Sequence, residues 1–339
     1  MDLLTVVPVA VAVIIVLAVG FDFVNGFHDA ANVVATMIST RAFQPESALV
    51  IAALAEFLGP FIFGTAVARA IGQGIIHPED ATVAVVLAAL SGAIAWNIIT
   101  WYFGLPSSSS HALVGGLAGS VLAAAGPRHL NLHGFLSIVT VLFVSPVVGL
   151  FAGYWSQKIL LLLSRGFTPR LNDAYKRLQV VSAVTLALSH GTNDAQKSMG
   201  IITLTLLSAG LIPAFAVPRW AMAACAAAMG LGTAIGGWRI IKTVGDRIYR
   251  LRPINGFAAQ SASAAVIMSA ALLGGPVSTT HVVSSAIAGV GSAERIKAVR
   301  WNNAFDIALA WIVTIPASAA LAAASYFLMR VVFHFSKGA

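Results

Sequence analysis

The chain has 339 residues, of which 58% are hydrophobic. Only 9% of the residues are charged, whereas charged residues make up about a quarter of a soluble domain. This composition excludes a soluble globular protein and a disordered protein, and it predicts an all-α polytopic membrane protein. The net charge of +8 does not indicate nucleic-acid binding, because the basic residues gather in short loops, as they do on the cytoplasmic side of membrane proteins.

Long runs without a charged residue follow one another along the chain. One membrane crossing takes about 20 apolar residues, so the runs have room for roughly 10 to 12 helical segments and leave no sizeable soluble domain. The runs cover residues 3–21, 81–127, 129–157, 198–218, 220–238, 253–293 and 307–329.

Three motifs recur once, in the same order, at an offset of about 165 to 170 residues, which indicates an internal repeat. Residues 25–30 match 190–195, residues 64–66 match 232–234, and residues 106–111 match 276–281. We therefore predict a first repeat over residues 1–163, a cytoplasmic linker with a short amphipathic helix over 164–178, and a second repeat over 179–339.

Equivalent loops of the two repeats differ in charge. Residues 69–80 carry one basic and two acidic residues, whereas their counterpart at 238–253 carries five basic and one acidic. Because short basic loops face the cytoplasm, the pattern predicts two inverted-topology repeats of about five membrane segments each, with broken helices and re-entrant hairpins at the midplane. We expect a multi-pass protein of the plasma (inner) membrane, surrounded by the lipid bilayer, with its N-terminus outside. Transporters are built in this way.

Ionisable side chains inside membrane spans are costly and mark functional sites. Two matched acidic motifs carry most of them, and each places a glycine among carboxylate, amide and imidazole groups. This predicts a broken helix whose freed carbonyls, with the carboxylates, suit a hard cation such as Na⁺. The carboxylates are also able to carry a proton, and polar helix packing is the alternative. The motif residues are Asp22, Asn25, His28, Asp29 and Asn32, and then His190, Asn193, Asp194 and Lys197.

Two hydroxyl runs follow Pro106 and Pro276. Proline in the first turn and Ser or Thr at the cap mark helix N-termini, whose free N–H groups and positive dipole end bind phosphate or sulfate. Two such termini meeting at the midplane would clamp a tetrahedral oxyanion, with ordinary capping as the alternative. The anion-binding candidates are Ser107, Ser108, Ser109, Ser110, Ser278, Thr279 and Thr280.

Four further groups have more than one interpretation. Lys197 either adds positive charge for the anion or neutralises Asp194 on the same helix face. Glu56 lies within a span and either carries a coupling proton or cation or pairs with a base. His111 and His281 follow the hydroxyl runs, and without an HExxH motif or a cysteine cluster they favour hydrogen bonding over a zinc site.

Residues 25–32 and 189–197 resemble the paired signatures of the inorganic phosphate transporter (PiT) family, and residues 232–239 and 274–281 are similar to other segments of it. The resemblance covers nearly the whole chain. It implies symport of inorganic phosphate with H⁺ or Na⁺, in bacterial relatives as a neutral complex with a divalent metal. It places the anion at the hydroxyl runs. It places the cation, Na⁺ included, at Asn25, Asp29, Asn193 and Asp194. From their places in the acidic motif and within a span, Asn32 and Glu56 are further coupling-ion candidates. His28 stands where many members have Asn, which favours H⁺.

Three alternatives remain. A sulfate transporter of the same family fits because both ions are tetrahedral, and an anion channel would show flux without a coupling ion. An intramembrane hydrolase would use Ser, His and Asp, but the polar centre is duplicated and no G-x-S-x-G elbow is present. We therefore expect a transporter rather than an enzyme, with inorganic phosphate as its partner and no resident cofactor. A homo-oligomer is compatible with the sequence.

Overall fold

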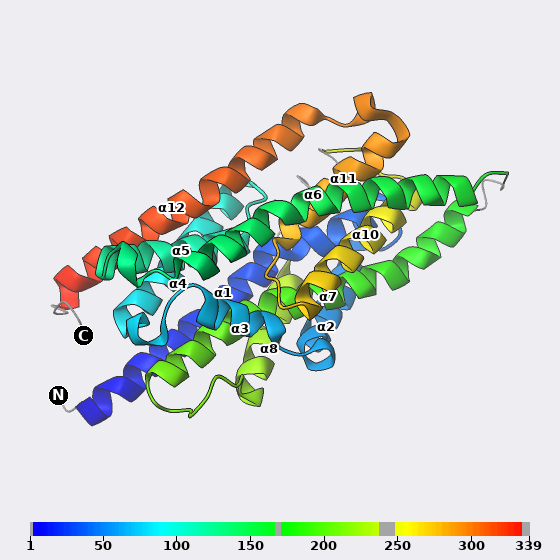
Figure 1. Cartoon of the computed structure of the whole chain (residues 1–339). Helices are drawn as coiled ribbons and strands as arrows, with labels where there is room; N and C mark the ends of the chain where they lie inside the picture. Colours follow the sequence, from blue (N-terminus) through cyan, green and yellow to red (C-terminus); the bar gives the residue numbers. More distant parts are fainter. Residues whose placement is uncertain (1–2, 167–170, 237–247, 334–339) are drawn as a thin grey trace.

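The computed structural model describes residues 3–166, 171–236 and 248–333. These residues form α-helices joined by short loops and 3-10 turns (Figure 1). In chain order the helices are α1 (Leu3–Ser39), α2 (Pro45–Phe63), α3 (Ala66–Gly74), α4 (Val83–Phe103), α5 (Ser109–Ala124), α6 (Leu132–Leu163), α7 (Leu171–Ser208), α8 (Arg219–Ile235), α10 (Pro253–Leu272), α11 (Thr279–Arg295) and α12 (Trp301–Phe333).

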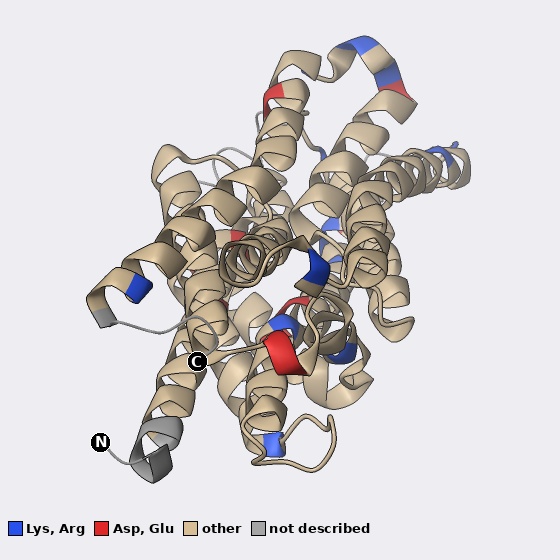
Figure 2. Cartoon of the chain, turned by 60° about the vertical axis from the view of Figure 1, so that its left-hand side comes forward, with Lys and Arg blue, Asp and Glu red and all other residues tan. Residues whose placement is uncertain are grey.

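Five of the described helices are long and apolar enough to cross a membrane. They are Val9–Ser39, Pro45–Phe63, Val83–Phe103, Leu132–Leu163 and Trp301–Val332. Large apolar side chains on their outer faces are exposed, including Phe151 on α6 (57%) and Val331 on α12 (73%). Such faces are stable against lipid rather than water. The protein is thus an all-helical membrane protein with several apolar spans, as predicted. Lys and Arg lie mostly at helix ends and in loops, including the loop after α11 (Figure 2).

Helices from distant parts of the sequence pack in matching pairs. The helix α6 lies against α11, and α12 lies against α5 (Figure 1). In the same way α8 packs on α1, and α2 packs on α7. The polar centres of α1 and α7 are therefore surrounded by other helices. Residues 189–206 of α7 are all buried inside the protein, although they include the acidic motif.

The predicted helix break at each acidic motif is wrong, because α1 and α7 run through the motifs as continuous helices. The motif glycines serve helix packing instead. A Cβ atom on Gly26 would lie 2.1 Å from the backbone oxygen of Met229 on α8, and one on Gly191 would lie 2.1 Å from that of Glu56 on α2. Glycine lets neighbouring backbones approach this closely.

The chain breaks instead at the two hydroxyl runs. The helix α4 ends at Gly104, whose φ of 65° is left-handed, and α5 begins after Ser108. In the matching place a left-handed Gly274 (φ 76°) precedes α11, which begins after Ser278. The Ser108 and Ser278 hydroxyls each accept a hydrogen bond from a backbone N–H three residues on, at 3.2 Å and 3.3 Å. The predicted helix N-termini at both runs are therefore confirmed.

Candidate functional site

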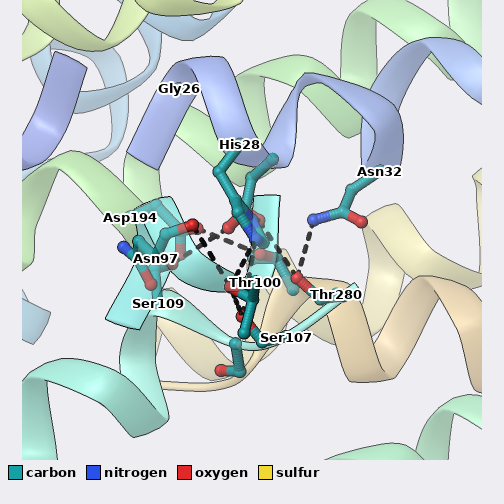
Figure 3. Close-up of polar contacts among 12 residues, drawn as sticks. Gly26, His28, Asn32, Asn97, Thr100, Ser107, Ser109, Asp194 and Thr280 are labelled. Atoms are coloured by element: carbon teal, nitrogen blue, oxygen red, sulfur yellow. Dashed lines mark hydrogen bonds and ion pairs between the residues drawn. The ribbon is translucent and has the colours of Figure 1, made fainter. Parts of the chain in front are cut away.

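The acidic motifs of α1 and α7 meet the N-termini of α5 and α11 in the buried interior (Figure 3). Nearly every polar side chain here is inaccessible: Asp29 is 2% exposed, and Asp194 is fully buried. Buried ionisable groups need partners, because an unpaired charge in a low-dielectric interior is costly. The partners come from the hydroxyl runs.

Asp29 lies at the centre of the first group of contacts. Its Oδ1 is 2.7 Å from His28 Nδ1, and its Oδ2 accepts a hydrogen bond from Ser109 at 2.9 Å. The Thr280 hydroxyl donates to Oδ1 at 3.3 Å. Asp29 thus touches both hydroxyl runs. His28 continues the network, since its Nε2 lies 3.3 Å from the hydroxyl of Thr100 on α4.

Asp194 occupies the matching place on α7. Thr279 donates to its Oδ2 at 3.0 Å, and Lys197 forms an ion pair with its Oδ1. His190 Nε2 lies 3.3 Å from Oδ2. The Thr279–Asp194 contact repeats the Ser109–Asp29 contact at the aligned positions of the two motifs.

For both Lys197 and Glu56, one predicted role was to pair with an oppositely charged side chain. The structure shows these partners. Lys197 neutralises Asp194, as one interpretation expected, and its Nζ also donates to the Ser110 hydroxyl at 2.5 Å. Glu56 pairs with a base: its Oε1 is 2.8 Å from His190 Nδ1, and Thr233 on α8 donates to its Oε2 at 2.5 Å.

Three groups lie close enough together to hold a cation between them. One ligand atom from each of Asp29, His190 and Asp194 lies within 4.8 Å of the others, and all three residues are buried. Several side-chain oxygens nearby in the motifs have no hydrogen-bond partner among the described residues, and such oxygens suit a hard cation. They are Asp22 Oδ2, Asn25 Oδ1, Asn32 Oδ1 and Asn193 Oδ1.

The other predicted site residues lie at the edge of this centre. Asp22 accepts a hydrogen bond from Ser198 at 2.6 Å rather than from a hydroxyl run. Asn193 donates to the backbone oxygen of Gly275 at 3.2 Å. His111 and His281 stack on each other with ring centroids 4.3 Å apart, and His281 stacks on Trp311 at 4.0 Å. Both histidines therefore pack where the two helix N-termini meet. His111 also shares a 2.9 Å hydrogen bond with Ser108, as predicted, whereas the ring nitrogens of His281 have no partner among the described residues.

Sequence reasoning missed three polar residues of the site. Thr100 shares a 2.7 Å hydrogen bond with Ser107, and the nearby Asn97 is buried with no partner among the described residues. Both lie inside an apolar run, and the aligned positions in the second repeat are apolar, so the repeat gave no signal. Thr233 belongs to one of the repeated motifs, and the structure shows that it donates a hydrogen bond to Glu56.

Fold and site together define a multi-pass membrane protein whose buried centre joins hydroxyl-capped helix N-termini to a set of carboxylates. The model of the phosphate transporter family (PHO4) matches residues 25–322, so the chain belongs to this family. The predicted family resemblance is confirmed.

Similar proteins cover almost the whole chain. A probable low-affinity inorganic phosphate transporter of Bacillus subtilis is 46% identical over 98% of this chain and 100% of its own length. One of Rhizobium meliloti is 45% identical over 98% of this chain and 100% of its own length. A solved structure described as the sodium-dependent phosphate transporter matches with a TM-score of 0.86 and 26% identity, over 96% of this chain and 100% of that one.

Proposed function

We propose that this chain is a secondary active transporter that carries inorganic phosphate across the plasma (inner) membrane in symport with H⁺ or Na⁺. One observation carries the proposal: groups suited to bind an anion are in direct contact with groups suited to bind a cation. Anion-binding helix N-termini donate hydrogen bonds directly to the carboxylates that would bind the cation, at Ser109–Asp29 and Thr279–Asp194. The relatives described as phosphate transporters favour phosphate over sulfate.

The anion site consists of the two hydroxyl runs. The first turns of α5 and α11 offer backbone N–H groups and the positive ends of their helix dipoles. Hydroxyls of Ser109, Ser110, Thr279 and Thr280 surround these ends and are almost fully buried. When phosphate enters, the hydroxyls of Ser109, Thr279 and Thr280 turn from the carboxylates to the anion as donors. The Ser110 hydroxyl turns to it from the backbone oxygen of Val277, and Lys197 beside Ser110 supplies positive charge.

Charge balance explains why phosphate needs a companion cation. The centre holds the carboxyl groups of Asp22, Asp29, Glu56 and Asp194, whereas Lys197 is its one lysine or arginine among the described residues. A phosphate dianion added to ionised carboxylates in a buried site meets strong repulsion. A bound Na⁺ or proton at the Asp29, His190 and Asp194 cluster removes part of that repulsion, so anion and cation bind together. Oxygen and imidazole ligands also suit a divalent cation that accompanies phosphate.

The repeats supply the transport movement. We propose that residues 1–163 and 179–339 form two repeats of opposite orientation, that α4–α5 and α10–α11 are re-entrant hairpins, and that the N-terminus lies outside. The matching helix pairs α6–α11 and α12–α5 support this arrangement, because each repeat packs its last long helix on the hairpin of the other. Rocking of such repeats exposes a midplane site to each side in turn.

Radiolabelled phosphate uptake into proteoliposomes tests the proposal. One set of vesicles receives an inward Na⁺ gradient, a second an inward H⁺ gradient, and each is measured with and without Mg²⁺ and excess sulfate. We expect concentrative phosphate uptake under one gradient that sulfate does not inhibit. Strong inhibition by sulfate would favour a sulfate transporter, and uptake that follows only the phosphate gradient would favour a channel.

A further inference from the structure

A group of arginines lies at the end of α1, apart from the buried site. An open cavity of about 800 Å³ lies between the end of α1, the segment before α10 and the residue before α12. Four guanidinium groups at one cavity repel one another unless an anion lies between them. The arginines are Arg41, Arg250, Arg252 and Arg300.

These arginines differ in their partners. Arg252 is held in place by Glu294, with its guanidinium 2.5 Å from the carboxylate, so its charge is already balanced. Arg41 and Arg250 are exposed to the cavity and form no ion pair with any residue that the structure describes. The cavity therefore retains uncompensated positive charge, which is the condition for attracting an oxyanion.

Arg41 has a backbone conformation that is unfavourable for a residue other than glycine. The helix α1 ends in a Schellman motif, in which Ala42 N–H donates to Met37 O and Arg41 N–H donates to Ile38 O, both at 3.0 Å. Glycine is the usual residue at the left-handed position of this motif. Arg41 occupies it with a φ of 54° and is the one non-glycine residue of the described chain with positive φ. A strained position that places a guanidinium at a cavity points to a role for that side chain.

Polar side chains connect the cavity to the buried site along one face of α1. Asn32, Thr36 and Thr40 are spaced by four residues, so they share a face of the helix, and all three are buried. Asn32 donates to Thr280 in the buried site, whereas Thr40 lines the cavity. At a rise of about 1.5 Å per residue, Asn32 and Thr40 lie roughly 12 Å apart along the helix.

Polar side chains of the neighbouring helices hydrogen-bond to this row on α1. Gln260 of α10 donates to Thr36 at 2.8 Å and accepts from Ser182 of α7 at 2.6 Å. Gln179 of α7 accepts from Thr40 at 2.7 Å. The seam between α1, α7 and α10 is thus polar from the buried centre to the cavity, which is the lining that a hydrated ion requires.

We propose that this arginine pocket is a second binding site for a phosphate group, at the mouth of the path to the buried site. Arginine forks match phosphate oxygens in pairs, and Ser39 adds a hydroxyl donor. The phosphate group belongs either to inorganic phosphate or to the headgroup of an anionic phospholipid. The position on a transport path rests on the proposed function, whereas the binding chemistry of the pocket does not.

Phosphate binding to the purified full chain tests the proposal without transport. The protein is placed in nanodiscs of phosphatidylcholine at low ionic strength, and bound ³²P-phosphate is titrated to saturation. The pocket variant is Arg41→Gln with Arg250→Gln. The matched control is Arg295→Gln with Lys297→Gln, which removes the same charge from exposed positions outside the cavity.

We expect two classes of bound phosphate in the native chain. The pocket variant weakens one class by about tenfold or more, and that class is also the one that added salt suppresses. The control variant keeps both classes. Replacing Ser110 and Thr280 by alanine removes the other class, so loss of the buried site is distinguishable from loss of the pocket. If the double variant fails to fold, Arg250→Gln alone serves, because Arg250 lies outside the helices.

A second arm distinguishes the two sources of the phosphate group. The titration is repeated in nanodiscs that contain phosphatidylglycerol, and phospholipid retained by the detergent-purified protein is measured by native mass spectrometry. Inorganic phosphate is the ligand if phosphatidylglycerol does not displace it. A headgroup is the ligand if phosphatidylglycerol competes and retained lipid disappears in the pocket variant only. Equal phosphate binding and equal lipid retention in the pocket and control variants would overturn the proposal.

Discussion

Lys197 on α7 donates to Ser110 at the start of α5 over 2.5 Å, and Asn32, its aligned partner on α1, donates to Thr280 at the start of α11 over 2.9 Å. Each contact joins the acidic motif of one half of the sequence to the hydroxyl run of the other half. The two contacts differ in one respect, because lysine carries a charge and asparagine does not. The proposed phosphate site is therefore asymmetric in charge, although the contacts around it are nearly symmetric.

Replacing Lys197 with asparagine tests this asymmetry, because it makes the aligned positions alike. A hydrogen bond to a charged group contributes about 1.5 to 3 kcal/mol, so we expect KM for phosphate to rise about 10- to 100-fold. Initial rates of ³²P uptake in proteoliposomes measure it. Lys158→Asn, on the exposed face of α6, is the control. An unchanged KM in the Lys197 variant would show that the anion binds elsewhere.

Asp29→Asn and Asp194→Asn test the proposed coupling site. Each amide keeps the size of the side chain but removes a charge from the cluster with His190, so neither a proton nor Na⁺ is held there. We expect both variants to insert normally and to lose concentrative uptake. Asp306→Asn makes the same change at an exposed position of α12 and leaves uptake intact. Full accumulation in either site variant would remove that carboxylate from the coupling mechanism.

The sequence predicted the members of the buried centre better than their contacts. The repeat placed Asp29, Asp194 and both hydroxyl runs together, because duplicated polar motifs in apolar runs must face inward. It did not predict the partner of each carboxylate, which depends on how α5 and α11 approach α1 and α7. The base beside Glu56 was foreseen only as a type, since His190 lies far away in the sequence.

Two features depend on neighbouring helices and could not be predicted from local sequence patterns. Glycine among polar residues predicts a break, yet Gly26 and Gly191 lie in unbroken helices because their missing side chains admit α8 and α2. The arginine pocket escaped because Arg41 and Arg250 are far apart in the chain and only the fold brings them to one cavity. Composition shows how much charge a loop carries but not which loops meet.

Gly191→Ala tests the packing role of the motif glycine. The new Cβ would lie 2.1 Å from a backbone oxygen of Glu56, which cannot rotate away, so α2 and α7 must separate. Overpacking of this kind costs about 3 kcal/mol, and we expect a clearly lower melting temperature in detergent. Gly20→Ala is the control, because nothing lies within 4 Å of its added Cβ. Equal melting temperatures for the two variants would contradict close packing at Gly191.

Glu294, near the end of α11, makes stability depend on pH. Burial alone raises the pKa of a carboxyl group, but hydrogen bonds from Arg252 and Asn255 outweigh this effect and hold the pKa of Glu294 below its ordinary value. A carboxyl group whose pKa is lower in the folded chain stabilises the fold above its unfolded pKa. That contribution is lost as the pH falls through the folded pKa.

We therefore expect Glu294→Gln to lower the melting temperature at neutral pH and to flatten its fall as the pH drops below about 5. Arg252 then loses its partner, and its charge joins those of Arg41 and Arg250 at the cavity. The same variant should thus strengthen phosphate binding at the pocket while it weakens the fold. Melting curves across this pH range and ³²P titration measure both effects, with the exposed Glu46→Gln as the control. A pH dependence identical to that of the native chain would show that the Glu294–Arg252 pair does not stabilise the fold.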